Sequence, residues 1–208
     1  MIRLYDYHLD ENGFRVRLLL SMLGLPFETV AVDKAPGREH QMPAMLAINP
    51  TGTLPTLEDG DVRLFGTGAI LAYLVRAYAP DQKWLPVDPA DFGRVQQWLG
   101  FAGRELQAAI DAREAALFSA AGASDTDRQR ARNALRIMDD HMVLRQIEGA
   151  EWFVGDTPTL ADLALLPSFA LSRDAGIDHD EYPALRRWLR RFRALPGFIT
   201  MPGIPDYH

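Results

Sequence analysis

The chain has 208 residues, of which 48% are hydrophobic and 24% charged, which is typical of a globular protein with one large domain or two small ones. It contains no cysteine, so disulfides, thiolate metal sites and a cysteine nucleophile are excluded. The net charge of -6 argues against nucleic acid as the main partner, because phosphate binding needs a basic surface. No long apolar run and no signal-peptide pattern occurs, so the sequence predicts a cytoplasmic protein that does not span a membrane.

The first part of the chain predicts a β-α-β unit. Residues 2–7 alternate between polar and apolar side chains and predict a strand. Apolar residues recur at helical spacing over 16–23, and Gly24 and Pro26 end the predicted helix. Residues 27–32 alternate again, so the helix can make the crossover that a parallel strand pair needs.

A β-hairpin and a helix are predicted next. Residues 39–47 predict a short helix or an irregular segment. Strands at 56–58 and 62–65 flank Asp59-Gly60, a dipeptide that strongly favours a hairpin turn. A helix follows from about Thr67. The first 80 or so residues therefore predict βαβ followed by ββα.

The second half of the chain predicts helices alone. The interval from Ala79 to Pro89 holds three prolines without periodicity, and we interpret it as a linker. Beyond it the strand patterns stop, which gives the fold class α/β plus all-α. The predicted boundaries are a first domain at 1–79, a linker at 80–88 and an all-helical domain at 89–208. Apolar residues at helical spacing predict helices around 92–106, 135–142 and 185–192.

Thr159 and Asp162 stand at the positions of a capping box at the start of a further helix. Each backbone donor satisfied in such a box is worth on the order of 1 kcal/mol. The pattern predicts a folding device and implies no chemistry.

The stretch at residues 49–57 (NPTGTLPTL) is the most distinctive in the chain. Pro55 cannot donate a hydrogen bond to a sheet, and the Leu54-Pro55 bond is the candidate for a cis peptide in a tight turn. With that geometry the backbone N–H and C=O of Leu54 face outward and can receive an extended peptide as an added strand. An ordinary loop-to-strand turn is the alternative.

The order of the elements, the 49–55 stretch and the 159–162 box together resemble the cytosolic glutathione S-transferase superfamily over essentially the whole chain. The resemblance implies a thioredoxin-like N-terminal domain and an all-helical C-terminal domain. It also implies glutathione as co-substrate, no metal, and a homodimer. In the family the residue before the cis-proline, here Leu54 before Pro55, pairs by its backbone with the cysteinyl part of glutathione.

The start of the first helix is similar to the "N-G-x-[KR]" pattern of bacterial nu-class members, through Asn12, Gly13 and Arg15. The resemblance makes Asn12 our first choice, and Tyr7 the second, for the residue that contacts the glutathione sulfur. Asn12 as a helix cap and Tyr7 as a packing residue are the alternatives. Asp10 stands where a Ser or Thr often lies, and its carboxylate would oppose thiolate formation through like-charge repulsion.

The family commonly has Glu-Ser or Gln-Ser before its third helix, where this chain has Gly66-Thr67. Thr67 can retain the contact with the γ-glutamyl carboxylate and can also cap the helix as its N-cap. Gly66 offers no charge to the γ-glutamyl amine, and losing that bond would cost about 1.5–3 kcal/mol. His40 falls where related members contact the glycine carboxylate of glutathione.

The resemblance implies an enzyme that uses the glutathione thiolate to attack a small electrophilic substrate. A glutathione-dependent disulfide-bond reductase or peroxidase of nu-like type is an alternative, because the attacking thiolate can come wholly from the ligand. A non-catalytic binding protein with a degenerate glutathione site, or a site for another ligand, is the competing class, favoured by Asp10 and Gly66. Residues that could face the second substrate between the domains are Trp98, Phe101, Arg104 and Glu105.

Overall fold

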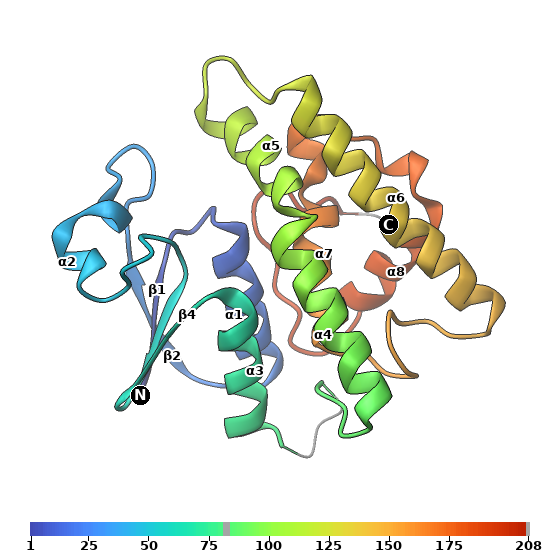
Figure 1. Ribbon diagram of the computed structural model, residues 1–208, viewed down its shortest axis with the longest axis horizontal. Coiled ribbons are helices and arrows are strands. Elements are labelled where there is room, and N and C mark those ends of the chain that lie inside the picture. Colours follow the sequence, from blue (N-terminus) through green and yellow to red (C-terminus); the bar gives the residue numbers. More distant parts are fainter. Residues whose placement is uncertain (81–83, 207–208) are drawn as a thin grey trace. The chain divides into compact units, whose positions relative to one another are not determined.

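The computed structural model describes residues 1–80 and 84–206, and the chain divides into two units, Met1–Pro80 and Asp81–His208 (Figure 1). Residues 81–83 of the predicted linker and 207–208 of the predicted second domain lie outside the described residues. No helix in the described ranges is long and apolar enough to cross a membrane.

The first unit contains a four-stranded mixed sheet in the order β2-β1-β3-β4. Strands β1 and β2 are parallel, whereas β1 with β3 and β3 with β4 are antiparallel. The predicted βαβ and ββα order, and with it a thioredoxin-like domain, is confirmed. Its elements are β1 (Ile2–Asp6), α1 (Glu11–Met22), β2 (Phe27–Ala31), a 3₁₀ turn (Glu39–Gln41), α2 (Pro43–Leu46), β3 (Thr56–Asp59), β4 (Val62–Phe65) and α3 (Thr67–Tyr78).

The two faces of the sheet are covered differently. Alternate residues of a strand point to opposite faces, so Asp6 faces α1, where it pairs with Arg17, and Tyr5 faces away. Tyr5 packs in a cluster with Val32 and Leu54, with Met45 of α2 against it. Figure 1 shows α1 and α3 on one side of the sheet and α2 on the other.

A row of alternating charges crosses the sheet. Arg3 of β1 lies opposite Glu28 and Glu58, and Glu58 lies opposite Arg63. Arg3 Nη1 is 3.1 Å from Glu58 Oε2, and Arg63 Nε donates to Glu58 Oε1 at 2.8 Å. Opposite charges directly across a sheet favour that register by a few tenths of a kcal/mol up to about 1 kcal/mol.

In its described part the second unit has five α-helices and no strand. Every residue of α7 is buried, and this helix packs against α4, α5 and α8. The helices are α4 (Pro89–Arg104), α5 (Gln107–Phe118), α6 (Asp125–Ile147), α7 (Leu160–Ala170) and α8 (Pro183–Arg193), with two 3₁₀ turns at Ser172–Ala175 and His179–Glu181.

The helix predicted at 92–106 is wrong in its extent. The helix α4 begins at Pro89 and ends at Arg104, and Leu106 is the N-cap of the separate helix α5. Leu106 and Ala109 are both buried, so the apolar spacing continues across the break and conceals it in the sequence.

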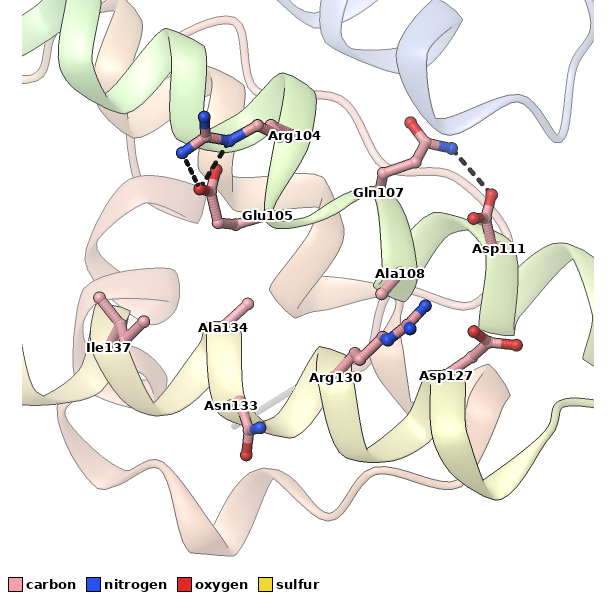
Figure 2. Close-up of a pocket in the computed structure, with 10 residues that line it drawn as sticks. All are labelled: Arg104, Glu105, Gln107, Ala108, Asp111, Asp127, Arg130, Asn133, Ala134 and Ile137. Carbon is pink, nitrogen blue, oxygen red and sulfur yellow. Dashed lines mark hydrogen bonds and ion pairs between the residues drawn. The ribbon is translucent and has the colours of Figure 1, made fainter.

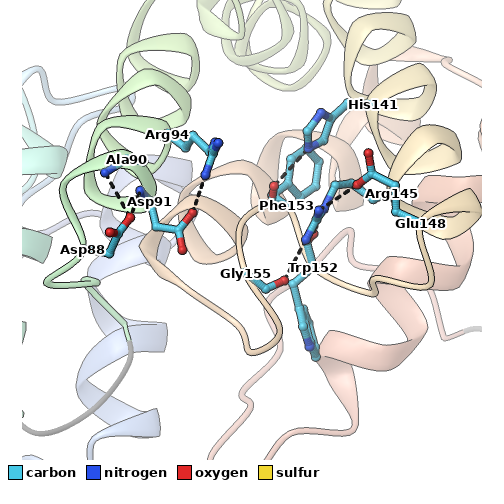
Figure 3. A network of polar contacts seen from close by, with 10 residues as sticks. All are labelled: Asp88, Ala90, Asp91, Arg94, His141, Arg145, Glu148, Trp152, Phe153 and Gly155. Atoms are coloured by element: carbon cyan, nitrogen blue, oxygen red, sulfur yellow. Dashed lines mark hydrogen bonds and ion pairs between the residues drawn. The ribbon is translucent and has the colours of Figure 1, made fainter.

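The predicted capping box is confirmed at the start of α7. Asp162 accepts from the backbone N–H groups of Phe153 and Thr159 at 3.0 and 2.9 Å and from Trp188 Nε1 at 3.0 Å. Burial raises the pKa of Asp162 to about 6 although these donors act to lower it. Helix α6 also holds this segment, because Arg145 donates to Gly155 O at 2.8 Å (Figure 3).

Candidate functional site

Asp10 begins the helix α1 as a buried N-cap. Its Oδ1 accepts from the N–H of Gly13 at 2.8 Å, and its Oδ2 lies 2.8 Å from Lys34 Nζ. The sequence analysis considered only the negative charge of this carboxylate, whereas in the structure the Lys34 ammonium lies beside it. Lys34 lies 24 residues away in the sequence and reaches Asp10 only because the chain returns to this end of the sheet after β2.

Asn12 lies in the first turn of α1. Its Oδ1 accepts from Arg15 Nη1 at 2.8 Å, and Arg15 also pairs with the buried Glu11 at 2.9 Å. Because a guanidinium can only donate, this contact fixes which side of the Asn12 amide is oxygen. Within residues 1–80 and 84–206, the Asn12 NH₂ group has no protein partner, so it remains a donor for a ligand.

Beneath this turn lies Asp6, which the sequence analysis did not single out. Its Oδ2 pairs with Arg17, whereas its buried Oδ1 has no partner among the described residues. A Cβ atom at position 13 would overlap Asp6 Oδ1, so any side chain there would force the Asp6 carboxylate to move. Burial raises the pKa of Asp6 to about 7, with Asp10 adding to the increase and Arg17 opposing it.

The loop before β3 is organised by Asn49, a buried residue of the distinctive stretch to which no role was given. Its Nδ2 donates to Thr53 O at 2.8 Å and to Thr56 Oγ1 at 3.1 Å. Its Oδ1 accepts from the N–H of Thr51 at 3.0 Å. The Asn49 side chain therefore hydrogen-bonds to both ends of the loop. The asparagine of the N-P-x-G pattern could have indicated this role from the sequence.

Leu54 lies in this loop with its side chain buried, and the Leu54-Pro55 peptide bond is cis. The strand β3 begins only at Thr56, and across the described ranges the backbone N–H and C=O of Leu54 make no hydrogen bond with the protein. Two main-chain groups at the end of a sheet are thus left available to an added strand.

Tyr7 packs against the cluster that contains Leu54, and its hydroxyl donates to Ala35 O at 3.3 Å. It also lines a hollow of about 400 Å³ together with Asp6, His8, Arg17, Thr29, Ala31, Val32, Asp33 and Ala35. His40 lies in the 3₁₀ turn, and its carbonyl lies against Gly52 of the loop before β3.

The start of α3 carries no side-chain cap. Gly66 is the N-cap with φ 81°, a conformation that glycine adopts without strain, and the first helical bond runs from the N–H of Ile70 to Gly66 O. The prediction that Thr67 is the N-cap is therefore wrong, because Thr67 is the first helical residue. In the described chain its hydroxyl and the N–H groups of residues 67–69 have no partner, so this twelve-residue helix presents open donors to an anion.

The register of the sheet brings these groups to one edge. Tyr5, Thr56 and Phe65 lie in one row across β1, β3 and β4. Tyr7, Leu54 and Gly66 each follow or precede that row by one or two residues. The free backbone of Leu54, the start of α3 and the end of β1 that leads into α1 therefore share this edge of the first unit.

The helical unit has a different kind of hollow. A space of about 460 Å³ is lined by residues from the end of α4, from α5 and from α6: Arg104, Glu105, Gln107, Ala108, Asp111, Asp127, Arg130, Asn133, Ala134 and Ile137 (Figure 2). Its charges are mixed, and Arg104 Nε donates to Glu105 Oε1 at 2.8 Å. A smaller space of about 410 Å³ is lined in part by Phe101, Arg104 and Glu105.

Trp98, which the sequence analysis considered for a substrate cleft, is buried in an aromatic cluster. Its ring centroid lies 4.8 to 5.2 Å from those of Phe101, His141 and Phe153. It is therefore a core residue. Among the described residues no three His, Asp or Glu side chains are arranged to hold a metal ion.

Known protein families match both units of the chain. The family described as glutathione S-transferase, N-terminal domain, matches residues 1–76, and that described as glutathione S-transferase, C-terminal domain, matches residues 107–191. Maleylacetoacetate isomerase of Pseudomonas aeruginosa is 30% identical, over 95% of this chain and 93% of its own.

Solved structures agree with these matches. A possible glutathione S-transferase of Rhodopseudomonas palustris has a TM-score of 0.83 and 30% identity, over 100% of this chain and 93% of that one. Ure2p in complex with glutathione has a TM-score of 0.84 and 26% identity, over 94% of this chain and 95% of that one. The chain belongs to the cytosolic glutathione S-transferase superfamily.

Proposed function

We propose that the chain is a glutathione-dependent enzyme in which the glutathione thiolate attacks a small electrophilic substrate. The observation that carries this proposal is the unpaired backbone of Leu54, at an edge of the sheet where the start of α3 also lies. The structural likeness to Ure2p in complex with glutathione supports the choice of ligand.

Each part of glutathione has a candidate partner in the first unit. The cysteinyl backbone pairs with Leu54, next to Pro55, as an added strand. The γ-glutamyl carboxylate binds the open N–H groups and the Thr67 hydroxyl at the start of α3. His40 contacts the glycine carboxylate. Gly66 supplies no acid for the γ-glutamyl amine. Losing that charged hydrogen bond costs about 1.5–3 kcal/mol, so the affinity for glutathione is expected to be about tenfold to a hundredfold lower than with Glu at this position.

The sulfur lies at the start of α1 in this proposal. The Asn12 NH₂ group donates to it, and the positive end of α1 favours the thiolate over the thiol. The hydroxyl of Tyr7 already donates to Ala35 O, which leaves Tyr7 as the second choice. The thiolate attacks an electrophilic carbon and forms a C–S bond, and the electron pair leaves with the displaced group or is protonated on the adduct.

The first test is titration calorimetry of reduced and oxidised glutathione against the purified protein. Binding of the reduced form between micromolar and low-millimolar concentrations supports the proposal, and no binding at several millimolar overturns it. Tighter binding of the oxidised form instead favours the disulfide reductase alternative. Turnover is then measured with an aryl halide and a disulfide and, because one relative is named maleylacetoacetate isomerase, also with maleylacetoacetate as an isomerisation substrate.

The Asn12 role is tested with Asn12→Asp. The variant keeps an oxygen for Arg15, removes the NH₂ donor and adds a negative charge at the start of α1, so Asn12→Ala, which removes the donor without adding a charge, is measured beside it. Turnover should fall on the order of tenfold to a hundredfold with an unchanged melting temperature. Equal losses of turnover and of thermal stability would mean that Asn12 only supports the helix.

We also infer a homodimer from the family. Support comes from α6, where Ile137, Leu144 and Ile147 are 52%, 60% and 78% exposed. Their spacing of seven and three residues puts them on one side of the helix, in reach of a second copy. Sedimentation should give the mass of two chains, and Leu144→Asp should shift it toward one.

A further inference from the structure

The counter-ion of Asp10 comes from the segment that follows β2. Lys34 Nζ lies 2.8 Å from Asp10 Oδ2, and the two side chains are 21% and 3% exposed. The other oxygen of Asp10 is occupied by the N–H of Gly13. An ion pair that is this far buried is screened by salt much less than an exposed one, so each charge acts on its surroundings.

The charged groups around the first turns of α1 form three pairs. Asp6 of β1 pairs with Arg17, Glu11 pairs with Arg15, and Asp10 pairs with Lys34. The remaining titratable groups nearby are the Tyr7 phenol, the exposed His8 next to it, the Asp33 carboxyl, and Glu39, whose Oε2 accepts from the N–H of Asp33 at 2.7 Å. Above the Asp6 pKa of about 7 the three pairs balance, so a change in one member leaves a net charge at the donor end of α1.

The position of Lys34 determines what Asp10 does to a neighbouring thiolate. Without a counter-ion, the Asp10 carboxylate would repel a thiolate and keep the sulfur protonated. With Lys34 in place, the local charge is close to zero and the N–H dipoles at the start of α1 remain effective. Each Asp10 oxygen already accepts one hydrogen bond, from the N–H of Gly13 or from Lys34 Nζ.

We propose that Lys34 is a positioning residue for the thiol chemistry: by pairing with Asp10, it removes the negative charge at the start of α1 and allows the bound thiol to ionise. Lys34 acts through Asp10 and does not touch the sulfur. The inference rests on the proposed function, because it requires glutathione to place its sulfur at this helix start.

The test compares Lys34→Met, Asp10→Asn and the double variant with the wild type. Asn caps a helix about as well as Asp, so Asp10→Asn keeps the bond from Gly13. The thiolate of bound glutathione is followed by its ultraviolet absorbance while the pH is raised. We expect Lys34→Met to raise the thiol pKa by about one unit or more, because an unpaired carboxylate remains. Asp10→Asn should lower it by a similar amount.

The double variant should return the thiol pKa to within about half a unit of the wild-type value, because neither charge is left. Lys34→Arg keeps the positive charge and should have the thiol pKa of the wild type. If Lys34→Met does not fold, Lys34→Arg and Asp10→Asn together still test whether the charge at position 34 sets the thiol pKa. Arg63→Met is the matched control: it removes a cation from an ion pair with Glu58 in the same unit and should leave the thiol pKa unchanged.

The outcomes separate the two proposals. If the wild type binds no glutathione, the proposed function fails and this inference fails with it. If glutathione binds and the two single variants shift the thiol pKa in the same direction, or shift only the melting temperature, Lys34 is merely structural and this inference alone is overturned. Opposite shifts that cancel in the double variant support it.

Discussion

The helices α7 and α3 are of similar length, eleven and twelve residues, but their N-termini differ completely. Asp162 and Thr159 satisfy the backbone donors at the start of α7, and Trp188 and Phe153 donate to the same carboxylate. The start of α3 has a glycine as its cap and no side-chain acceptor. A helix start saturated by its own chain stabilises the fold, whereas one whose donors stay open is a place for an anionic ligand.

The largest expected effect is at the saturated helix start. Asp162→Ala leaves two backbone N–H groups and the Trp188 indole N–H buried without an acceptor. At about 1–3 kcal/mol for each of these three unsatisfied donors, the free energy of unfolding should fall by at least about 3 kcal/mol. Urea unfolding at about pH 8, above the Asp162 pKa of about 6, measures this with the carboxylate ionised.

Asp88→Ala is the control for this variant. Asp88 caps α4 by accepting from the N–H groups of Ala90 and Asp91 at 3.0 Å, but it is exposed (Figure 3). Water replaces the lost acceptor there, so the loss should be about 1 kcal/mol. Equal losses for the two variants would refute the distinction between a buried and an exposed cap.

Asp6 of β1, which lies beneath the first turn of α1, should make the stability of the protein depend on pH. Burial raises the pKa of Asp6 to about 7, above the value of about 4 in an unfolded chain. Between these values the folded state binds more protons than the unfolded state, so this group makes the free energy of unfolding fall as pH rises. Asp6→Asn removes that dependence.

Unfolding in urea should be measured for both proteins at several values from about pH 4 to 8. The difference in the free energy of unfolding, Asp6→Asn minus wild type, should rise by a few kcal/mol, up to about 4, between about pH 4 and about pH 7. Above about pH 7 it should stay constant. Parallel pH curves would mean that the Asp6 pKa is the same in the folded and unfolded chain.

The smallest effects should separate two threonines. Thr159 Oγ1 accepts from the N–H of Ala161 at 3.2 Å and donates to Asp162, so Thr159→Ala should lower stability by about 1 kcal/mol. Thr67 has no such partner in the described chain, so Thr67→Ala should change stability by less than about 0.5 kcal/mol. Its affinity for glutathione should fall about tenfold instead. Thermal melts measure the stability of both variants, and calorimetry measures their affinity for glutathione. If Thr159→Ala and Thr67→Ala lose stability and affinity to the same extent, the two threonines have the same role.

The fold was predictable from sequence because its patterns are local. Alternation gave the strands, helical spacing gave α1, α3 and α8, and the dipeptide Asp59-Gly60 gave the hairpin, whose positive φ falls on Gly60. The break between α4 and α5 was missed because Leu106 keeps the apolar spacing without a glycine or proline to mark the change.

The site was only partly predictable, because its decisive contacts are long-range. The N-P-x-G pattern pointed to Leu54, but nothing near Asp10 in the sequence announces Lys34. The positive φ of Gly66 depends on how the chain leaves β4, so the sequence placed the cap one residue too late, at Thr67. Asp6 looked like an ordinary strand residue, and only the packing of α1 on the sheet shows it as a buried acid.

The close contact between Asp6 and Gly13 means that substitutions at positions 6 and 13 depend on each other. A Cβ atom at position 13 would occupy the place of Asp6 Oδ1, so a Ser or Cys can enter there only if the Asp6 side chain moves away or is replaced. In an aligned family, a side chain at position 13 should therefore rarely coincide with an aspartate at position 6. A library that aims to place a cysteine at this helix start should vary both positions together.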